Sequence, residues 1–68
     1  MPSNIKAERV RINLKQEDLA RLVGVNRETI KRWERDIDSC KASNIKRLCR
    51  IFNVSSDYLI GLEERATR

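Results

Sequence analysis

The sequence has no histidine, one proline and two glycines among its 68 residues. So little proline and glycine argues against a turn-rich β-sandwich and against a disordered chain, which leaves a compact helical domain as the expected fold class. Without histidine, the two cysteines, Cys40 and Cys49, lack partners for a zinc site of the usual ligand spacing. We therefore expect an all-α fold with reduced thiols, no metal and no other cofactor.

Long apolar runs are missing as well. No apolar stretch approaches the roughly 20 residues that a membrane-spanning helix needs, and the N-terminal residues are too polar for a signal peptide. The sequence contains no repeat, low-complexity segment or linker, which predicts a single domain over residues 1–68 with a polar tail at about 63–68. The expected location is the cytoplasm, with no membrane contact.

The signatures of an enzyme are absent too. The sequence has no pairing of a nucleophile with a base and no glycine-rich phosphate loop, and so short a chain leaves no room for a sizeable pocket. The adjacent carboxylates Glu17 and Asp18 are better explained by the dipole of a helix that begins beside them. An enzyme is therefore not expected.

Positive charge is what the sequence has in excess. Fifteen Lys and Arg residues against ten Asp and Glu residues give a formal net charge of +5. This balance favours a polyanionic partner such as nucleic acid. Charge alone leaves open the alternative of simple solubility, because the acidic residues are interspersed and no long basic run stands out.

Candidate N-caps and apolar spacing predict five short helices. The first covers about 4–11 behind Ser3 as its N-cap, and the second starts near Gln16 and stops at Gly24. The third follows Asn26, a residue type favoured at N-caps. The apolar residues expected to face the core from the first two helices are Ile5, Val10, Ile12, Leu19, Ala20, Leu22 and Val23.

A polar loop over about 36–41 precedes the last two helices. The fourth helix is predicted from apolar residues that recur at the spacing of one helical face, namely Ile45, Leu48, Cys49 and Phe52. Ser55 is the expected N-cap of the fifth helix, which ends at Gly61. Cys49 is accordingly expected to be a small buried hydrophobe, whereas Cys40 in the loop is expected to be exposed.

The segment 16–35 has the spacing of a helix-turn-helix. A small residue at Ala20 lets the next helix approach closely, Gly24 permits a positive φ in the tight turn, and Ile30 fills the angle between the two helices. Each position is weak evidence alone, but their joint spacing predicts this motif, with a recognition helix over about 27–35.

These residues resemble the phage-repressor and Cro-type helix-turn-helix family of transcriptional regulators, also called the xenobiotic-response-element family. The resemblance lies in Lys-Gln-Glu-Asp-Leu-Ala-Arg-Leu-Val-Gly-Val at 15–25, Thr-Ile at 29–30, Trp-Glu-Arg at 33–35, Leu48, Phe-Asn-Val-Ser at 52–55 and Asp-Tyr-Leu-Ile-Gly at 57–61. It covers nearly the whole chain. It implies a lambda-repressor-like fold, in which five helices surround one small core.

The same resemblance implies roles for several residues of the motif. It implies an ion pair between Arg9 and Glu34, which makes both residues structural, and the spacing makes Trp33 a core residue. The chain departs from the family at Asp36, where glycine is usual, and at Cys40, where proline is frequent. Because Asp tolerates a left-handed conformation better than most residues, we expect the turn at Asp36 to be kept.

Side chains near the start of a recognition helix point at base edges in the major groove. Arg bonds guanine bidentately and Glu accepts from the cytosine amino group, which favours a half-site containing G·C pairs. The expected base-reading residues are Arg27, Glu28, Thr29 and Arg32. The expected phosphate contacts are Lys15, Gln16, Asn26, Lys31, Arg35 and Lys41. The alternatives are a solvated helix face for the former set and a purely capping role for Asn26.

One recognition helix covers only a few base pairs, so a homodimer on two half-sites is expected. The resemblance places the dimer contact near the last two helices, at Tyr58, Leu59, Ile60 and Leu62, unless these residues simply complete the core. The expected function is sequence-specific binding of double-stranded DNA by a transcriptional regulator, which is associated with the nucleoid when bound. Repression at a palindromic operator fits this function better than activation. The alternatives are an antitoxin, a restriction-system controller, or a protein-interaction module that antagonises another regulator. Any regulatory signal would act through a protein partner, the protein's own concentration or proteolysis.

Overall fold

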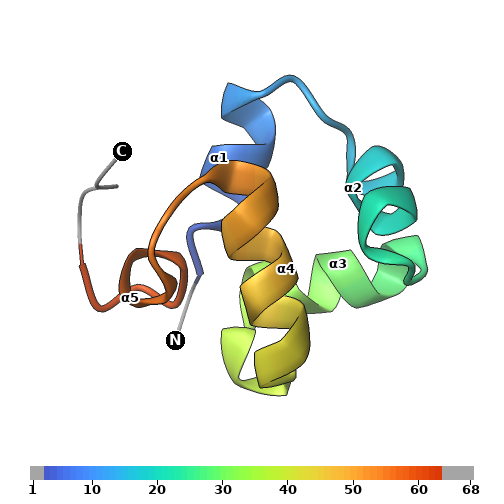
Figure 1. Cartoon of the computed structure of the whole chain (residues 1–68). Coiled ribbons are helices and arrows are strands. Elements are labelled where there is room, and N and C mark those ends of the chain that lie inside the picture. Colours follow the sequence, from blue (N-terminus) through green and yellow to red (C-terminus); the bar gives the residue numbers. More distant parts are fainter. Residues whose placement is uncertain (1–2, 64–68) are drawn as a thin grey trace.

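A computed structural model of the chain describes residues 3–63, whose regular elements are all helices, with no strand among the described residues. This confirms the all-α, five-helix prediction (Figure 1). The residues at 64–68, most of the expected polar tail, lie outside the described range. The elements are α1 (Ile5–Arg11), α2 (Gln16–Val23), α3 (Arg27–Arg35), the 3-10 turn η1 (Ile37–Ser39), α4 (Ala42–Phe52) and α5 (Ser56–Leu59). None of the described helices is long and apolar enough to cross a membrane.

One small core joins all five helices. The helix α4 lies across the middle of the molecule, with α5 on one side and α2 on the other (Figure 1). The largest fully buried side chains come from every α-helix and are Ile5, Leu19, Ile30, Leu48, Phe52 and Leu59. A core this thin depends on each of them, because a short chain has little apolar surface to bury.

Two predicted core residues are wrong. Val10 is 58% exposed and Leu22 is 61% exposed. In α1 the buried positions are Ile5 and Glu8, and Val10 lies about 200° around the helix from Glu8 at 100° per residue. Leu22 falls outside the buried face of α2 for the same reason, so both errors come from assigning the wrong phase to a short helix.

The core position next to Ile5 belongs instead to a carboxylate that the sequence analysis missed. Glu8 is 3% exposed, and its Oε2 accepts a hydrogen bond of 3.0 Å from the hydroxyl of Tyr58. Its Oε1 accepts from Nε of Arg11 at 2.9 Å. A buried charge is tolerated when it is paired and hydrogen-bonded in this way. This network ties α1 to α5.

The N-cap predicted for α1 is displaced by one residue. Asn4 occupies that position, while Ser3 donates from Oγ to the carbonyl of Trp33 at 3.0 Å. Asn4 also binds α5, because its backbone N–H donates to the carbonyl of Leu59 at 3.0 Å. The segment before α1 therefore fastens α3 and α5, while Oγ of Ser3 also accepts from the backbone N–H of Ile5 at 3.4 Å in the first turn of α1.

The turn between α2 and α3 is the one that the spacing predicts. Gly24 has a φ of +88° and donates from its N–H to the carbonyl of Ala20 at 2.8 Å. Asn26 then caps α3, because its Oδ1 accepts from the backbone N–H of Thr29 at 2.9 Å. Caps of this kind satisfy donors that the first turn of a helix leaves unpaired.

The loop after α3 takes a different path from the expected one. Asp36 is extended, with a φ of −147°, so the left-handed turn expected there is wrong. Its Oδ1 accepts from the N–H of Asp38 at 3.1 Å and starts η1, which buries Ile37. Cys40 follows η1 at 8% exposure, so its expected exposure is also wrong. Both thiols are free, and Cys49 is half-buried.

We expect Gly24→Ala to lower the free energy of unfolding by about 1–2 kcal/mol, because an L-residue is strained at this φ. A Cβ at Gly24 would meet no atom within 4 Å, so the loss comes from backbone strain and not from a clash. Gly24→Asn should lose less, since Asn visits this region more readily. Urea unfolding followed by the fluorescence of Trp33 measures both, and equal losses would contradict the explanation.

Cys40 makes stability depend on pH in the alkaline range. Burial raises the pKa of its thiol from 9.0 to about 11. The folded state therefore keeps the thiol neutral where the unfolded chain ionises it, so stability falls as pH rises from 9 through 11. The loss relative to Cys40→Ala should reach about 2 kcal/mol at the upper end, measured by urea unfolding at a series of pH values. Parallel pH profiles for the two proteins would refute this.

Candidate nucleic-acid interface

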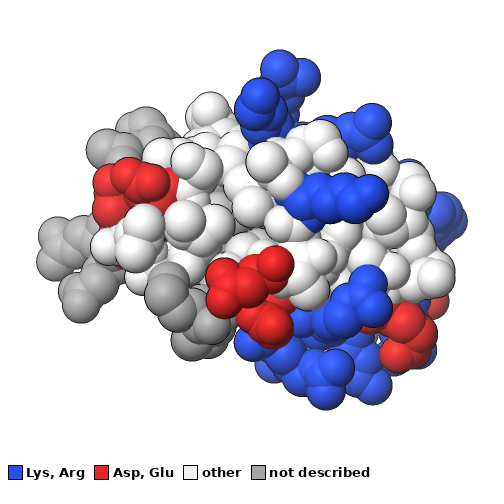
Figure 2. All heavy atoms as spheres, turned by 90° about the horizontal axis from the view of Figure 1, so that it is seen from below, with Lys and Arg blue, Asp and Glu red and all other residues white. Residues whose placement is uncertain are grey.

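The helix α3 has one face in the core and one in solvent. Ile30 and Trp33 are 0% and 2% exposed and anchor the inner face, which confirms Trp33 as a core residue. The outer face carries the predicted contact residues Arg27, Glu28, Lys31, Arg32 and Arg35, all of them exposed. Figure 2 shows that Lys and Arg gather most densely at the lower right of the face seen from below, with carboxylates beside them. The outer face is therefore free to meet a polyanion.

Thr29 and Asn26 are engaged within the chain. The backbone N–H and the Oγ1 hydroxyl of Thr29 both donate to Oδ1 of Asn26, each at 2.9 Å. Thr29 is also half-buried, unlike the other three predicted base readers. Its hydroxyl thus strengthens the cap of α3, and the capping role of Asn26 is the one that the geometry shows.

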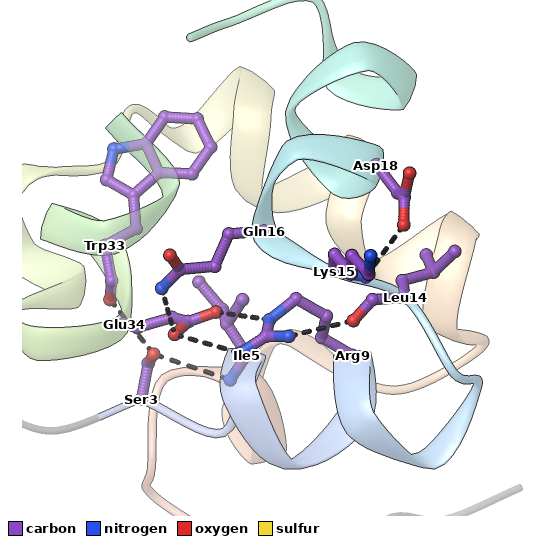
Figure 3. Close-up of polar contacts among 9 residues, drawn as sticks. All are labelled: Ser3, Ile5, Arg9, Leu14, Lys15, Gln16, Asp18, Trp33 and Glu34. Carbon is purple, nitrogen blue, oxygen red and sulfur yellow. Dashed lines mark hydrogen bonds and ion pairs between the residues drawn. The ribbon is translucent and has the colours of Figure 1, made fainter. Parts of the chain in front are cut away.

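A carboxylate near the end of α3 joins three helices. Nε of Arg9 donates to Oε2 of Glu34 at 2.7 Å, and the two side chains are 12% and 8% exposed (Figure 3). This confirms the expected ion pair. Arg9 also donates from Nη1 to the carbonyl of Leu14 at 2.8 Å, and Gln16 donates from Nε2 to Oε1 of Glu34 at 3.1 Å. Glu34 thereby connects α1, the start of α2 and the last turn of α3.

Gln16 is held beside an open depression of about 430 Å³. The depression is lined by Arg9, Lys15, Gln16, Glu17 and Arg27. It brings two predicted phosphate residues, from the start of α2, next to a predicted base reader at the start of α3. A helix N-terminus flanked by cations favours an anion.

The depression includes one carboxylate that the predicted phosphate site does not. Glu17 is exposed on its lining, where the sequence analysis assigned it only to the helix dipole. Arg9 contributes to the lining while it is bound to Glu34, so sequence reasoning found its partner but not its place beside Gln16. Closeness of this kind follows from how the helices pack, and no spacing in the sequence shows it.

Lys41 does not join this depression. It is the N-cap residue of α4, it is exposed, and η1 separates it from α3 in the sequence. Its phosphate contact stays a prediction. Within residues 3–63 there is no group of three acidic or sulfur side chains that could hold a metal ion.

The four residues predicted for a dimer contact separate into two pairs. Tyr58 and Leu59 are 7% and 0% exposed and complete the core of one chain, which is the alternative that the sequence left open. They are therefore unavailable as surface contacts. Ile60 is half-buried and Leu62 is 66% exposed, so these two remain as candidates.

The chain is similar to known helix-turn-helix proteins over most of its length. A helix-turn-helix family model, HTH_3, matches residues 5–59. The chain is 36% identical over 58 residues to the antitoxin PezA of Streptococcus pneumoniae, and 32% identical over 60 residues to the repressor protein C2 of Salmonella phage P22. These matches cover 85% and 88% of this chain but only 37% and 28% of the two relatives. No solved structure gave a significant match.

Breaking the ion pair between Arg9 and Glu34 should be costly. Glu34→Ala is expected to lower the free energy of unfolding by about 3 kcal/mol, because it leaves the nearly buried Arg9 without a counter-charge. The exposed Arg21, whose Nη2 lies 2.8 Å from Oδ1 of Asp18, provides the control, since Arg21→Ala should lose less than about 1 kcal/mol. The double variant Arg9→Met/Glu34→Leu should recover most of the loss in urea unfolding. If the loss in the double variant equals the sum of the losses in Arg9→Met alone and Glu34→Leu alone, the two side chains do not interact.

Proposed function

Because the chain belongs to the HTH_3 helix-turn-helix family, we propose that it is a transcriptional regulator that reads double-stranded DNA with the outer face of α3. The observation that carries this proposal is the exposed cationic face of α3, which adjoins the basic depression at the start of α2. A helix of this size fits the major groove, and phosphates bind well at helix N-termini.

The base contacts come from the first two turns of α3. Arg27, Glu28 and Arg32 point into solvent, and no ion pair within the described residues occupies them. Arg27 and Arg32 suit guanine, and Glu28 suits the amino group of cytosine. We therefore propose a half-site that contains G·C pairs, with Thr29 contributing its methyl group because its hydroxyl is engaged in the cap.

Phosphate contacts hold α3 in place on the DNA. Gln16 has its side chain fixed by Glu34 at the N-terminus of α2, and Lys15 lies beside it with an exposed side chain. Lys31 and Arg35 are exposed on α3 itself. Contacts of this kind position the protein without reading sequence.

We propose that the chain acts as a homodimer that represses by occupying a palindromic operator. The similarity to a phage repressor supports repression, and the narrow footprint of one recognition helix supports two half-sites. The dimer contact would use Ile60 and Leu62, which follow α5 at the surface.

The similarity to PezA favours a second candidate, an antitoxin that uses the same domain. Such a protein would also bind a toxin as its partner, and so would differ from a repressor in what it binds besides DNA. A restriction-system controller would share the DNA contacts, and neighbouring genes distinguish it. A protein-interaction module would need neither Arg27 nor Arg32.

Selection of tight binders from random duplex DNA tests the main proposal. A palindromic consensus is expected, and Arg27→Ala and Arg32→Ala should each weaken consensus binding by about 1–3 kcal/mol and relax one position of it. Arg50→Ala, which removes an exposed cation of α4, is the control for lost charge. If no consensus emerges, or if all three variants behave alike, α3 does not read bases.

A further inference from the structure

Arg47 of α4 reaches across to the end of α2. Its Nη1 donates to the carbonyl of Val23 at 3.1 Å. All three cations of α4 are exposed, but Lys46 and Arg50 make no hydrogen bond or ion pair within residues 3–63. The helix α4 contains no acidic residue that would attract Arg47 elsewhere.

The acceptor of this hydrogen bond has a special position in the fold. Val23 is the last residue of α2, and Gly24 directly after it adopts the left-handed conformation that turns the chain toward α3. The carbonyl groups at a helix C-terminus lack intrahelical partners and carry partial negative charge. The neighbouring N–H groups of Gly24 and Val25 are both bound to the carbonyl of Ala20, at 2.8 and 3.0 Å.

The guanidinium of Arg47 therefore contacts the turn from outside the helix-turn-helix segment. Only the three residues 24–26 separate α2 from α3, so a change in the peptide between Val23 and Gly24 rotates the start of α3. That start carries Arg27 and Glu28. The opposite end of α3 is held independently by Glu34.

We infer that Arg47 is a positioning residue, which holds the α2–α3 turn and thereby orients the base-reading end of α3 without touching DNA. This inference rests on the proposed function for its effect on sequence reading. It makes α4 part of the recognition machinery and adds a residue outside segment 16–35 to the residues that determine specificity.

The first measurement needs no DNA. Amide hydrogen exchange at Gly24 and Val25 should be roughly tenfold faster in Arg47→Met than in the native protein, because the turn opens more readily without its charged donor. Arg50→Met removes the same charge from the same helix and should leave these amides unchanged. Amides of the core, such as that of Leu48, distinguish this local opening from a general loss of stability.

The second measurement compares consensus with unrelated DNA at several salt concentrations. Arg47→Met should reduce the ratio of specific to non-specific affinity roughly tenfold, with an unchanged salt slope because no phosphate contact is lost. Arg47→Lys keeps a charged donor and should restore most of the ratio. Arg50→Met should leave the ratio unchanged.

Two results overturn the inference. Unchanged exchange at Gly24 and Val25 in Arg47→Met shows that the hydrogen bond does not hold the turn, whatever happens with DNA. Equal weakening on all sequences, with the salt slope lowered by about one, shows that Arg47 binds phosphate directly. A native protein with no preferred sequence overturns the proposed function instead, and the exchange data then decide the role of Arg47 alone.

Discussion

The carboxylate of Glu34 is the constraint on which the arrangement of the helices depends. At 8% exposure it needs a counter-charge, and Arg9 supplies one from α1 at 2.7 Å. Gln16 supplies a further donor from the start of α2. One charge therefore fixes the relative placement of α1, α2 and α3. Glu34 also orients the side chain of Gln16 at the N-terminus of α2. The carboxylate that stabilises the fold therefore also positions a residue that lines the depression.

The helix α3 is held at both ends and along its inner face, and its outer face is free. Near its C-terminus, the side chain of Glu34 accepts a hydrogen bond from Arg9, and the carbonyl of Trp33 accepts one from Ser3. At its N-terminus Asn26 caps the first turn. These contacts use the inner face and the ends, so the cations of the outer face make none of the hydrogen bonds that hold the helix. A stable helix with an unoccupied polar face is what recognition of a groove requires.

Prediction from sequence failed where a residue's surroundings come from distant segments. A glutamate such as Glu8 is expected to face solvent from sequence alone. Its hydrogen-bond donor is the hydroxyl of Tyr58, which lies fifty positions away and which no nearby residue predicts. Val10 is expected in the core for the converse reason, since its apolar character does not show which side of α1 faces α4 and α5. Cys40 is buried, against the expectation, because Asp36 starts η1 and does not form the left-handed turn expected there.

The sequence alone determined the helix-turn-helix, the five helices and the exposed cations of α3. These follow from short-range rules, because a cap such as Asn26 acts three residues along the chain and a glycine such as Gly24 acts on its own φ. In contrast, the depression shared by Gln16, Lys15 and Arg27 and the burial of Tyr58 and Leu59 in the core follow from tertiary packing. Their neighbours come from other helices, and the packing of those helices against one another sets distances that no local pattern encodes.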